Sequence, residues 1–347
     1  MQSFVFPGNI DESIMKIGSQ PFMYMRTEEF SKINKESEQI LLDLIHCTGG
    51  RTIIYTGSGT GAMSAVVENY CTTKQKAFVI DGGSFGHRWF SLCEYYEVPV
   101  YDFKVPFAKD IDYAELEKKV AEEKPDVFLC QHHETSTGQL FDLRKISEIC
   151  HKHDVSLVVD VISSFLAEEL NMDDLDIDIC ITSTQKGLNI PPGLSVLFFN
   201  KKLDGYKFNH KGYYWDFDDN FSNLKRGQTP FSPATITFLQ LNARLKQIEA
   251  EGGERKNIEA VHHRALFFRE LCRKYGWTVP AETPSYAVTG FQTSDDESRR
   301  VFKGLIEKYD TYIMPGSKPG FYRVSHMGLQ TDEELVELAE HIHEFEK

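Results

Sequence analysis

The stretch ITSTQKGLNIPPG, residues 181–193, places a lysine just after an expected buried strand. The preceding DLDIDIC, residues 174–180, alternates acidic and apolar residues and leads into a β-branched run typical of such a strand. The Pro-Pro-Gly at 191–193 indicates a turn. An ammonium group is costly to bury without a partner, so Lys186 needs either a solvated loop or a chemical reason to lie there.

Strand and helix patterns alternate on both sides of this stretch. Six short apolar segments are expected to be strands: RTIIYTG (51–57), KAFVIDGG (76–83), DVFLCQHHE (126–134), VSLVVDVISS (155–164), DICITST (178–184) and LSVLFF (194–199). Between them lie helical segments such as GAMSAVVENYC (61–71), GHRWFSLCEYYE (86–97) and DLRKISEICHKH (142–153). The alternation predicts an α/β fold with a mostly parallel sheet covered by helices, and functional residues should collect at the carboxyl ends of the strands.

The pattern changes after about residue 235. A helical stretch over 234–251 is interrupted by GGE, and NIEAVHHRALFFRELCRKYG (257–276) is a second amphipathic helix that ends in glycine. A strand-helix-strand-helix unit follows, and its last helix begins with the capping box Thr331-x-x-Glu334. We therefore expect an irregular N-terminal arm (1–25), a large domain (26–250) and a smaller α+β domain (251–347).

The composition argues against several classes of function. The 52 carboxylates and 38 basic residues of this 347-residue chain give a formal net charge of −14, which disfavours nucleic acid and anionic membranes as partners. No apolar run approaches the roughly 20 residues of a membrane span, and the N-terminus lacks the features of a signal peptide. The seven cysteines include no CxxC pair. These features predict a soluble, cytoplasmic protein with reduced thiols.

Histidine pairs suggest a metal site only weakly. His132-His133 and His151-x-His153 have no carboxylate or cysteine at ligand spacing to complete a set. We therefore expect no metal.

The glycine-rich motif YTGSGTGAM (55–63) lies between an expected strand and an expected helix. Glycines let backbone N–H groups approach a phosphate, and the N-terminus of a helix favours negative charge. The same residues fit a dinucleotide-binding pattern, Gly57-x-Gly59-x-x-Ala62, with Asp81 near the position of a ribose-binding acid. A tight turn without a ligand is the simplest alternative.

Asp160 and Lys186 extend this motif into a possible cofactor site. Asp160 ends an apolar strand, where a carboxylate needs a cationic or hydrogen-bonding partner, although a helix N-cap would also explain it. A phosphate-binding turn, a buried acid and a lysine on a later strand end are together what pyridoxal phosphate requires: phosphate anchorage, a partner for the pyridinium nitrogen and a Schiff-base lysine.

These motifs resemble the class V branch of the fold-type I pyridoxal-phosphate enzymes. STQKGLNIPPG is the most specific of them, and GSGTGA, HHETSTGQL and VVDVISS occur in the order typical of aminotransferases similar to the alanine–glyoxylate, serine–glyoxylate and 2-aminoethylphosphonate transaminases. The resemblance extends from Pro7 to FYRVSHMG (321–328). It implies a seven-stranded, mostly parallel sheet in the large domain, pyridoxal 5'-phosphate as cofactor and a homodimer.

The resemblance also implies roles for individual residues. Lys186 and Asp160 would be catalytic, with Lys186 as the Schiff-base residue and Asp160 at the ring nitrogen. Arg323 would bind the substrate carboxylate, for which a structural ion pair is the alternative. The remaining cofactor contacts would come from Ser58, Gly59 and Thr60 at the phosphate, Gln185 beside Lys186, Phe85 stacked on the ring, Ile162 on its other face, Ser136 or its neighbour Thr135 near the ring oxygen, and Thr229 from the neighbouring subunit.

Some positions depart from the family pattern. Many relatives have a His-Arg pair where this chain has Met25-Arg26. Desulfurases of the branch usually have histidine before the lysine and a mobile cysteine loop, whereas Gln185 precedes Lys186 here. The aromatic run YYWDFDDNF (213–221) would form core or dimer packing, or a wall of the substrate channel.

The sequence thus predicts a transaminase that moves an amino group from alanine, serine or 2-aminoethylphosphonate to a 2-oxo acid such as pyruvate or glyoxylate. A small donor is expected because no second arginine for a distal carboxylate is evident, although Arg26 or Arg88 could serve. The alternatives are a class V lyase or desulfurase-like enzyme, a nicotinamide-dependent dehydrogenase, and a pyridoxal-binding protein without catalysis.

Overall fold

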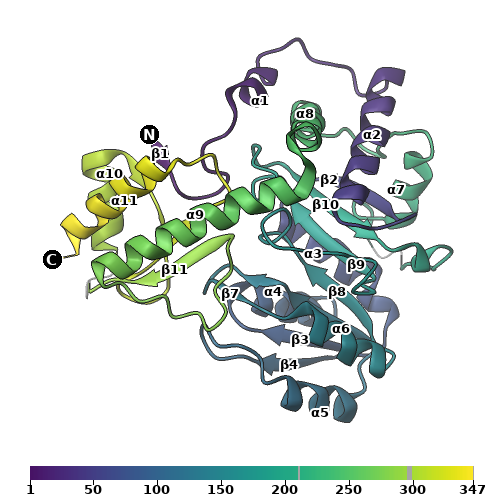
Figure 1. Ribbon diagram of the computed structural model, residues 1–347. Coiled ribbons are helices and arrows are strands. Elements are labelled where there is room, and N and C mark those ends of the chain that lie inside the picture. Colours follow the sequence, from purple (N-terminus) through teal and green to yellow (C-terminus); the bar gives the residue numbers. More distant parts are fainter. Residues whose placement is uncertain (210–211, 295–298, 347) are drawn as a thin grey trace.

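A computed structural model describes residues 1–209, 212–294 and 299–346 of the chain. Its centre is a seven-stranded sheet in the order β2-β10-β9-β8-β5-β3-β4 (Figure 1). The bounds are β2 (Arg51–Thr56), β3 (Ala77–Asp81), β4 (Val100–Lys104), β5 (Val127–Gln131), β8 (Ser156–Asp160), β9 (Ile179–Ser183) and β10 (Leu194–Phe199). Only β10 is antiparallel to its neighbours, so the other six strands share one direction and end at the same edge. The predicted α/β class with a mostly parallel sheet is confirmed.

Helices cover both faces of the sheet because successive strand residues point to opposite sides. One apolar core contains Ile54 and Phe78 and packs under α2 (Glu28–Leu44), α5 (Tyr113–Glu123), α6 (Leu143–Lys152) and α8 (Thr235–Glu251). The other contains the adjacent Ile53 and Val79 and packs under α3 (Gly59–Asn69), α4 (Ser84–Tyr95) and α7 (Phe217–Leu224). Residues of β3, β5, β9 and β10 are all buried, as expected of strands covered on both faces.

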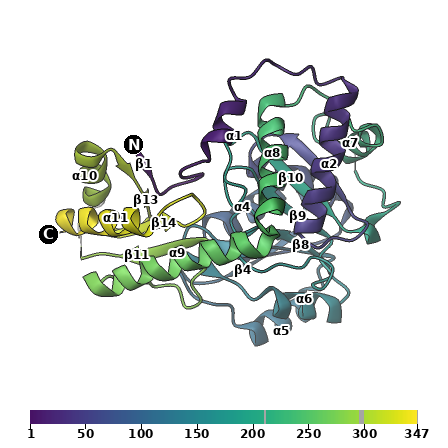
Figure 2. The same cartoon turned by 45° about the horizontal axis from the view of Figure 1, so that its top comes forward.

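The C-terminal part forms a smaller α+β unit with a core of its own. The long helix α9 (Gly253–Tyr275) runs from the large sheet to this unit, as Figure 2 shows. An antiparallel sheet has the order β11 (Val288–Gln292), β14 (Phe321–Ser325), β13 (Met314–Pro315), and α10 (Arg300–Tyr309) and α11 (Asp332–Phe345) pack beside it. The predicted capping box at the start of α11 is confirmed.

Short elements complete the chain. They are α1 (Glu12–Ile17), the two-residue strands β1 (Gln2–Ser3), β6 (His133–Glu134), β7 (Gln139–Leu140) and β12 (Thr311–Tyr312), and the 3-10 turns Cys71–Thr73 and Lys201–Leu203. No helix among the described residues is both long and apolar enough to cross a membrane.

The N-terminal arm is more ordered than the sequence suggested. It contains α1, whose N-cap Asp11 accepts a hydrogen bond from the Ser13 N–H, and β1 pairs in parallel with β12. Further along the arm, the Phe4 carbonyl accepts the N–H of Ser325, and the Asn189 side chain donates to the carbonyls of Pro7 (2.7 Å) and Asn9 (3.1 Å). Tertiary hydrogen bonds therefore order a segment that has no strong periodicity of its own. The division at residues 25 and 250 remains our proposal.

Candidate active site

Asp160 and Lys186 lie at the ends of neighbouring parallel strands. Asp160 is the last residue of β8, and Lys186 follows β9 by three residues. Their side chains are only 5% and 7% exposed. Asp160 accepts a hydrogen bond from the Ile162 N–H at 2.7 Å. The Lys186 amine has no hydrogen-bond or ion-pair partner in the part of the chain that the structure describes, but lies 3.1 Å from the centroid of the Phe6 ring.

Burial brings the proton affinities of the two groups together. It raises the pKa of Asp160 to about 7, an effect that Glu134 adds to and that Lys186 and Arg88 oppose. It lowers the pKa of Lys186 to about 7, with Asp160 acting in the opposite direction and Arg323 in the same direction. An acid with free hydrogen-bonding capacity and an unpaired, readily deprotonated amine fit the ring nitrogen and the aldehyde of pyridoxal phosphate.

The glycine turn lies directly against the end of β8. Ser58 is the exposed N-cap of α3, and its hydroxyl accepts the Gly61 N–H at 3.4 Å. A side chain at Gly59 would place its Cβ 2.4 Å from Ile162 Cδ1, so a larger residue would require Ile162 to shift. The turn therefore presents the N-terminus of an 11-residue helix next to Asp160, which suits the phosphate of the same cofactor.

Arg88 joins this site, whereas Arg26 is held elsewhere. The Arg88 guanidinium donates to Thr60 Oγ1 at 2.8 Å and lies over the Phe85 ring at 4.8 Å, with no carboxylate partner among the described residues. Arg26 donates to the side chain of Gln228 and to the carbonyls of Thr229 and Pro230. Of the two arginines considered from the sequence, the fold thus brings Arg88 to the glycine turn.

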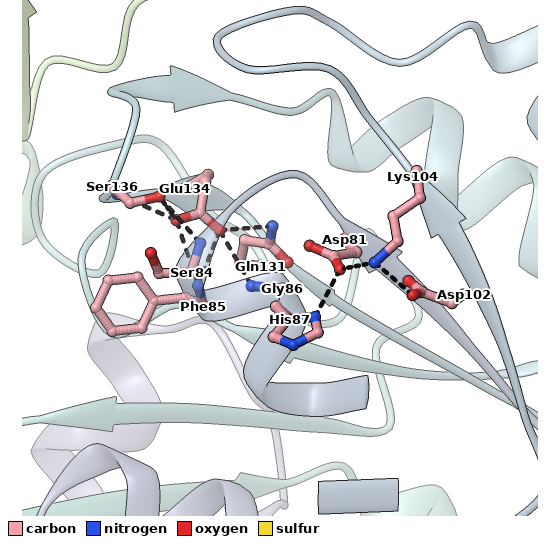
Figure 3. Close-up of polar contacts among 10 residues, drawn as sticks. All are labelled: Asp81, Ser84, Phe85, Gly86, His87, Asp102, Lys104, Gln131, Glu134 and Ser136. Atoms are coloured by element: carbon pink, nitrogen blue, oxygen red, sulfur yellow. Dashed lines mark hydrogen bonds and ion pairs between the residues drawn. The ribbon is translucent and has the colours of Figure 1, made fainter. Parts of the chain in front are cut away.

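Glu134 is a central residue that sequence reasoning did not single out. Its fully buried carboxylate accepts the backbone N–H groups of Phe85, Gly86 and Ser136, at 3.1 to 3.4 Å. The Ser136 hydroxyl (2.5 Å) and Gln131 Nε2 (3.0 Å) also donate to it, as Figure 3 shows. The carboxylate thus ties the first turn of α4 to the loop after β5. The available signal was an acid inside HHETSTGQL, directly after a buried strand.

Ser136 and Thr135 have different partners. Because the Ser136 hydroxyl donates its only proton to Glu134 and also accepts the Ser84 N–H at 3.1 Å, it has no proton left to donate to another group. The buried Thr135 hydroxyl instead pairs with the Ser163 hydroxyl at 2.7 Å, three residues beyond Asp160. Between the two candidates for the ring oxygen, this geometry favours Thr135.

Arg323 of β14 has hydrogen-bond capacity to spare. Its guanidinium donates to the carbonyls of Thr135 (2.8 Å) and Pro315 (3.1 Å), and its buried Nε has no partner within the described ranges. Burial lowers the pKa of Arg323, an effect that Glu134 opposes. No carboxylate forms an ion pair with Arg323 among the residues described. It lines a hollow of about 350 Å³ together with Ser84, Lys104, Ser136 and Ser317.

Asp81, the acid considered for a ribose, has local partners. Lys104 Nζ lies 2.5 Å from Asp81 Oδ2 and 2.6 Å from Asp102 Oδ2, and His87 Nδ1 lies 2.9 Å from the same Asp81 oxygen (Figure 3). Asp81, His87 and Asp102 are close enough to hold a metal ion in principle. The ammonium group of Lys104 already occupies the position between the two carboxylates.

The remaining predicted residues lie around this centre. Gln185 is half-buried beside Lys186. Thr229 is buried, and its hydroxyl donates to the Phe231 carbonyl at 2.7 Å. The aromatic run divides: Phe217 and Phe221 enter the core, Trp215 covers Gly57 and Gly61 of the glycine turn, and Tyr213 is 87% exposed.

Comparisons with known proteins relate the whole chain to one family. A model of the aminotransferase class-V family matches residues 17–263. The L-aspartate–glyoxylate aminotransferase of Paracoccus denitrificans is 26% identical, with 94% of this chain and 86% of that protein covered. The serine–glyoxylate aminotransferase of Hyphomicrobium methylovorum is 27% identical, with 95% and 85% covered. A solved aspartate aminotransferase of subgroup IV from Thermus thermophilus has a TM-score of 0.90 at 22% identity, covering 99% of this chain and 98% of that one.

Proposed function

We propose a substrate class for this chain, which belongs to the class V aminotransferase family and is therefore a transaminase that depends on pyridoxal 5'-phosphate. It takes the amino group from a small donor, namely alanine, serine or 2-aminoethylphosphonate, and passes it to a 2-oxo acid such as pyruvate or glyoxylate. The observation that supports this proposal is Arg323, a partly buried guanidinium that forms no ion pair with a carboxylate of the described chain. A carboxylate or phosphonate of the substrate suits its planar fork.

Different residues of the site would hold different parts of the cofactor. The N–H groups of Ser58, Gly59 and Thr60 would bind the phosphate, and Phe85 and Ile162 would enclose the ring. When bound, pyridoxal phosphate supplies the aldehyde that takes up the amino group and the ring that draws electrons from the substrate Cα.

The protons are handled by this chain's own groups. With its pKa lowered to about 7 by burial, the Lys186 amine can accept the proton of the substrate Cα as general base and then, as general acid, would release it at the carbon that had been the aldehyde. The Asp160 carboxylate holds a proton at the ring nitrogen. Arg323 binds the substrate carboxylate and so orients the Cα–H bond toward Lys186.

The other functions weighed from the sequence are less well supported. Family membership excludes the dehydrogenase, and Lys104 and His87 already engage Asp81. A desulfurase-like lyase would need a reactive cysteine, but all seven cysteines are buried. Because these thiols are also unbridged, we propose a cytoplasmic location.

We also propose a homodimer in which the Thr229 segment completes the partner's phosphate site. Tyr214 stacks on Phe231 with centroids 5.2 Å apart, and the neighbouring Tyr213 packs on the same ring at 5.6 Å. Tyr213 is largely exposed and Tyr214 is 40% exposed. A second subunit would cover this aromatic surface.

The donor class is tested by single half-reactions. The visible absorbance of the cofactor-loaded protein is followed after mixing with alanine, serine, 2-aminoethylphosphonate, aspartate or glutamate. At least one of the three small donors should convert the cofactor to its amine form rapidly. Conversion by glutamate or aspartate, with none by the small donors, would overturn the small-donor proposal.

The role of Arg323 is tested by substitution. Arg323→Ala should raise the KM of donor and acceptor by a factor corresponding to about 2 to 5 kcal/mol, because both carry the anionic group that it binds. Arg269→Ala is the matched control, since Arg269 is also partly buried and donates to Ser285 and Thr289 of the chain itself. It should lower stability without changing KM. Unchanged KM values in Arg323→Ala would show that the substrate anion binds elsewhere.

A further inference from the structure

The N-terminal arm brings an aromatic ring onto the amine of Lys186. The Phe6 centroid lies 3.1 Å from Lys186 Nζ, so no atom fits between the ring and the amine. A ring face attracts an ammonium group, and it remains an apolar wall when the amine is neutral. Phe6 is half-buried and packs against an apolar cluster that includes Ala167, Val288 and Met327.

The ring is held in place from two sides. Asn189, three residues after Lys186, donates to the carbonyls of Pro7 and Asn9 on the far side of Phe6 from β1. Gly8 has φ +79°, and a Cβ there would lie 2.9 Å from Gly328 Cα, so the arm passes tightly against the C-terminal unit. The Leu329 N–H also donates to the Asn9 carbonyl at 3.1 Å. The position of Phe6 is therefore fixed by both parts of the molecule.

We infer that Phe6 is a specificity-determining residue whose ring limits the side chain of the amino donor to a few atoms. The inference rests on the proposed function, in which a donor anchored by its carboxylate at Arg323 brings its amino group and Cα to Lys186. Atoms attached to that Cα must share the space around the amine with the Phe6 ring. A longer side chain has to displace the ring, and the contacts of Pro7, Gly8 and Asn9 hold the backbone that carries this ring.

The expected effect is a dependence on chain length that disappears when the ring is removed. In a fitted pocket, one methylene too many typically reduces kcat/KM by about tenfold or more. For the parent enzyme, half-reaction rates should therefore fall steeply along the series alanine, 2-aminobutyrate and norvaline. Phe6→Ala should flatten this series, so that norvaline gains at least about tenfold relative to alanine. For Phe6→Leu, which preserves an apolar contact for folding, the dependence of the rate on chain length should be intermediate between those of the parent and of Phe6→Ala.

A second measurement does not depend on turnover. Acetate, propionate, butyrate and valerate are titrated into the cofactor-loaded protein, and binding is read from the change in its visible spectrum. In the parent, affinity should decrease from propionate to valerate, and in Phe6→Ala valerate should bind at least as well as propionate. Phe4→Leu is the matched control, because Phe4 lies in the same arm but is buried in the core of the C-terminal unit. It should keep the parent's dependence on length.

The outcomes separate this inference from the proposed function. If Phe6→Ala and Phe6→Leu both keep the parent's length dependence for donors and for carboxylates, Phe6 does not set specificity, although the transaminase activity stands. If no small donor reacts with the parent but carboxylate binding still depends on Phe6, the proposed donor class is wrong. The Phe6 ring would nevertheless limit the length of the bound chain. An equal response in Phe4→Leu would assign the effect to loosening of the arm and overturn the role of the ring.

Discussion

Lys186 and Asp160 illustrate how two buried ionisable groups can both remain usable near neutral pH. Either group alone at this depth would be strongly biased toward its neutral form. Each group instead reduces the shift that burial causes in the pKa of the other, and both pKa values are about 7. An amine that is half deprotonated near pH 7 can take and return a proton with little driving force in either direction.

We predict that Lys186→Ala reduces amino transfer by on the order of 10³-fold or more, because the group that moves the Cα proton is lost. Lys202→Ala is the control, since Lys202 is an exposed lysine that pairs with Asp176 and Asp178. Stopped-flow half-reactions with an amino donor measure the difference. Transfer at the parent rate in Lys186→Ala would refute the assignment.

Lys186 also makes the stability of the cofactor-free protein depend on pH. Between pH 7 and 10.5 the unfolded chain binds a proton at Lys186 that the folded chain does not, so the free energy of unfolding increases as the pH rises. Compared with Lys186→Met, the parent should gain up to about 1.4 kcal/mol per pH unit between pH 8 and 10. Urea unfolding at several pH values tests this, and parallel curves for the two proteins would contradict it.

The pH dependence that Asp160 contributes to the free energy of unfolding has the opposite sign. Its folded pKa of about 7 exceeds the ordinary 3.8, so its contribution to the stability of the cofactor-free protein decreases as the pH rises from 3.8 to 7.

At the scale of elements, the first turn of α4 depends on one carboxylate. Glu134→Gln leaves N–H groups of Phe85 and Gly86 without a full acceptor. We predict a loss of about 2 to 4 kcal/mol in unfolding free energy, and a cofactor dissociation constant raised about tenfold because the Phe85 ring is no longer held over the site. Absorbance titration of the cofactor-free variant measures the second quantity.

Glu168→Gln is the comparison for this prediction. Glu168 is equally buried and accepts hydrogen bonds from Ser285 and Tyr286, away from α4. Its replacement should cost similar stability and leave the cofactor dissociation constant unchanged. Equal dissociation constants for Glu134→Gln and the parent would mean that Glu134 only stabilises the fold.

The sequence was informative where periodicity or glycine decides the local structure. The strands around Asp160 and Lys186 were readable because they are continuous apolar runs. By contrast, α1 was missed because its six residues bury only Ile14, and the arm is ordered by distant partners such as Asn189. The predicted site residues that belong to clear sequence motifs lie together at one edge of the large sheet. Glu134 and the contact between Arg88 and Thr60 depend on how α4 packs, which no local pattern encodes.

At the scale of the whole molecule, we predict a dimer at micromolar concentration in sedimentation experiments. Each site should need two chains, which a mixing experiment can show. Lys186→Ala and Thr229→Asp proteins, each inactive, should recover part of the activity when unfolded and refolded together, because one site of the mixed dimer has both native residues. Lys186→Ala mixed with Asp160→Ala should recover none, since these residues belong to one chain's site. A fully active monomer would refute the prediction.

The pairing of β1 with β12 has a consequence for the order in which the enzyme is made. Gln2 pairs with Thr311, and the Phe4 carbonyl accepts the N–H of Ser325, so the arm finds these partners only after Thr311 and Ser325 have been synthesised. The strands that carry Asp160 and Lys186 are complete well over a hundred residues earlier. On a nascent chain the large sheet can therefore assemble while Lys186 is still uncovered, and the Phe6 ring takes its place later, when the C-terminal unit has formed.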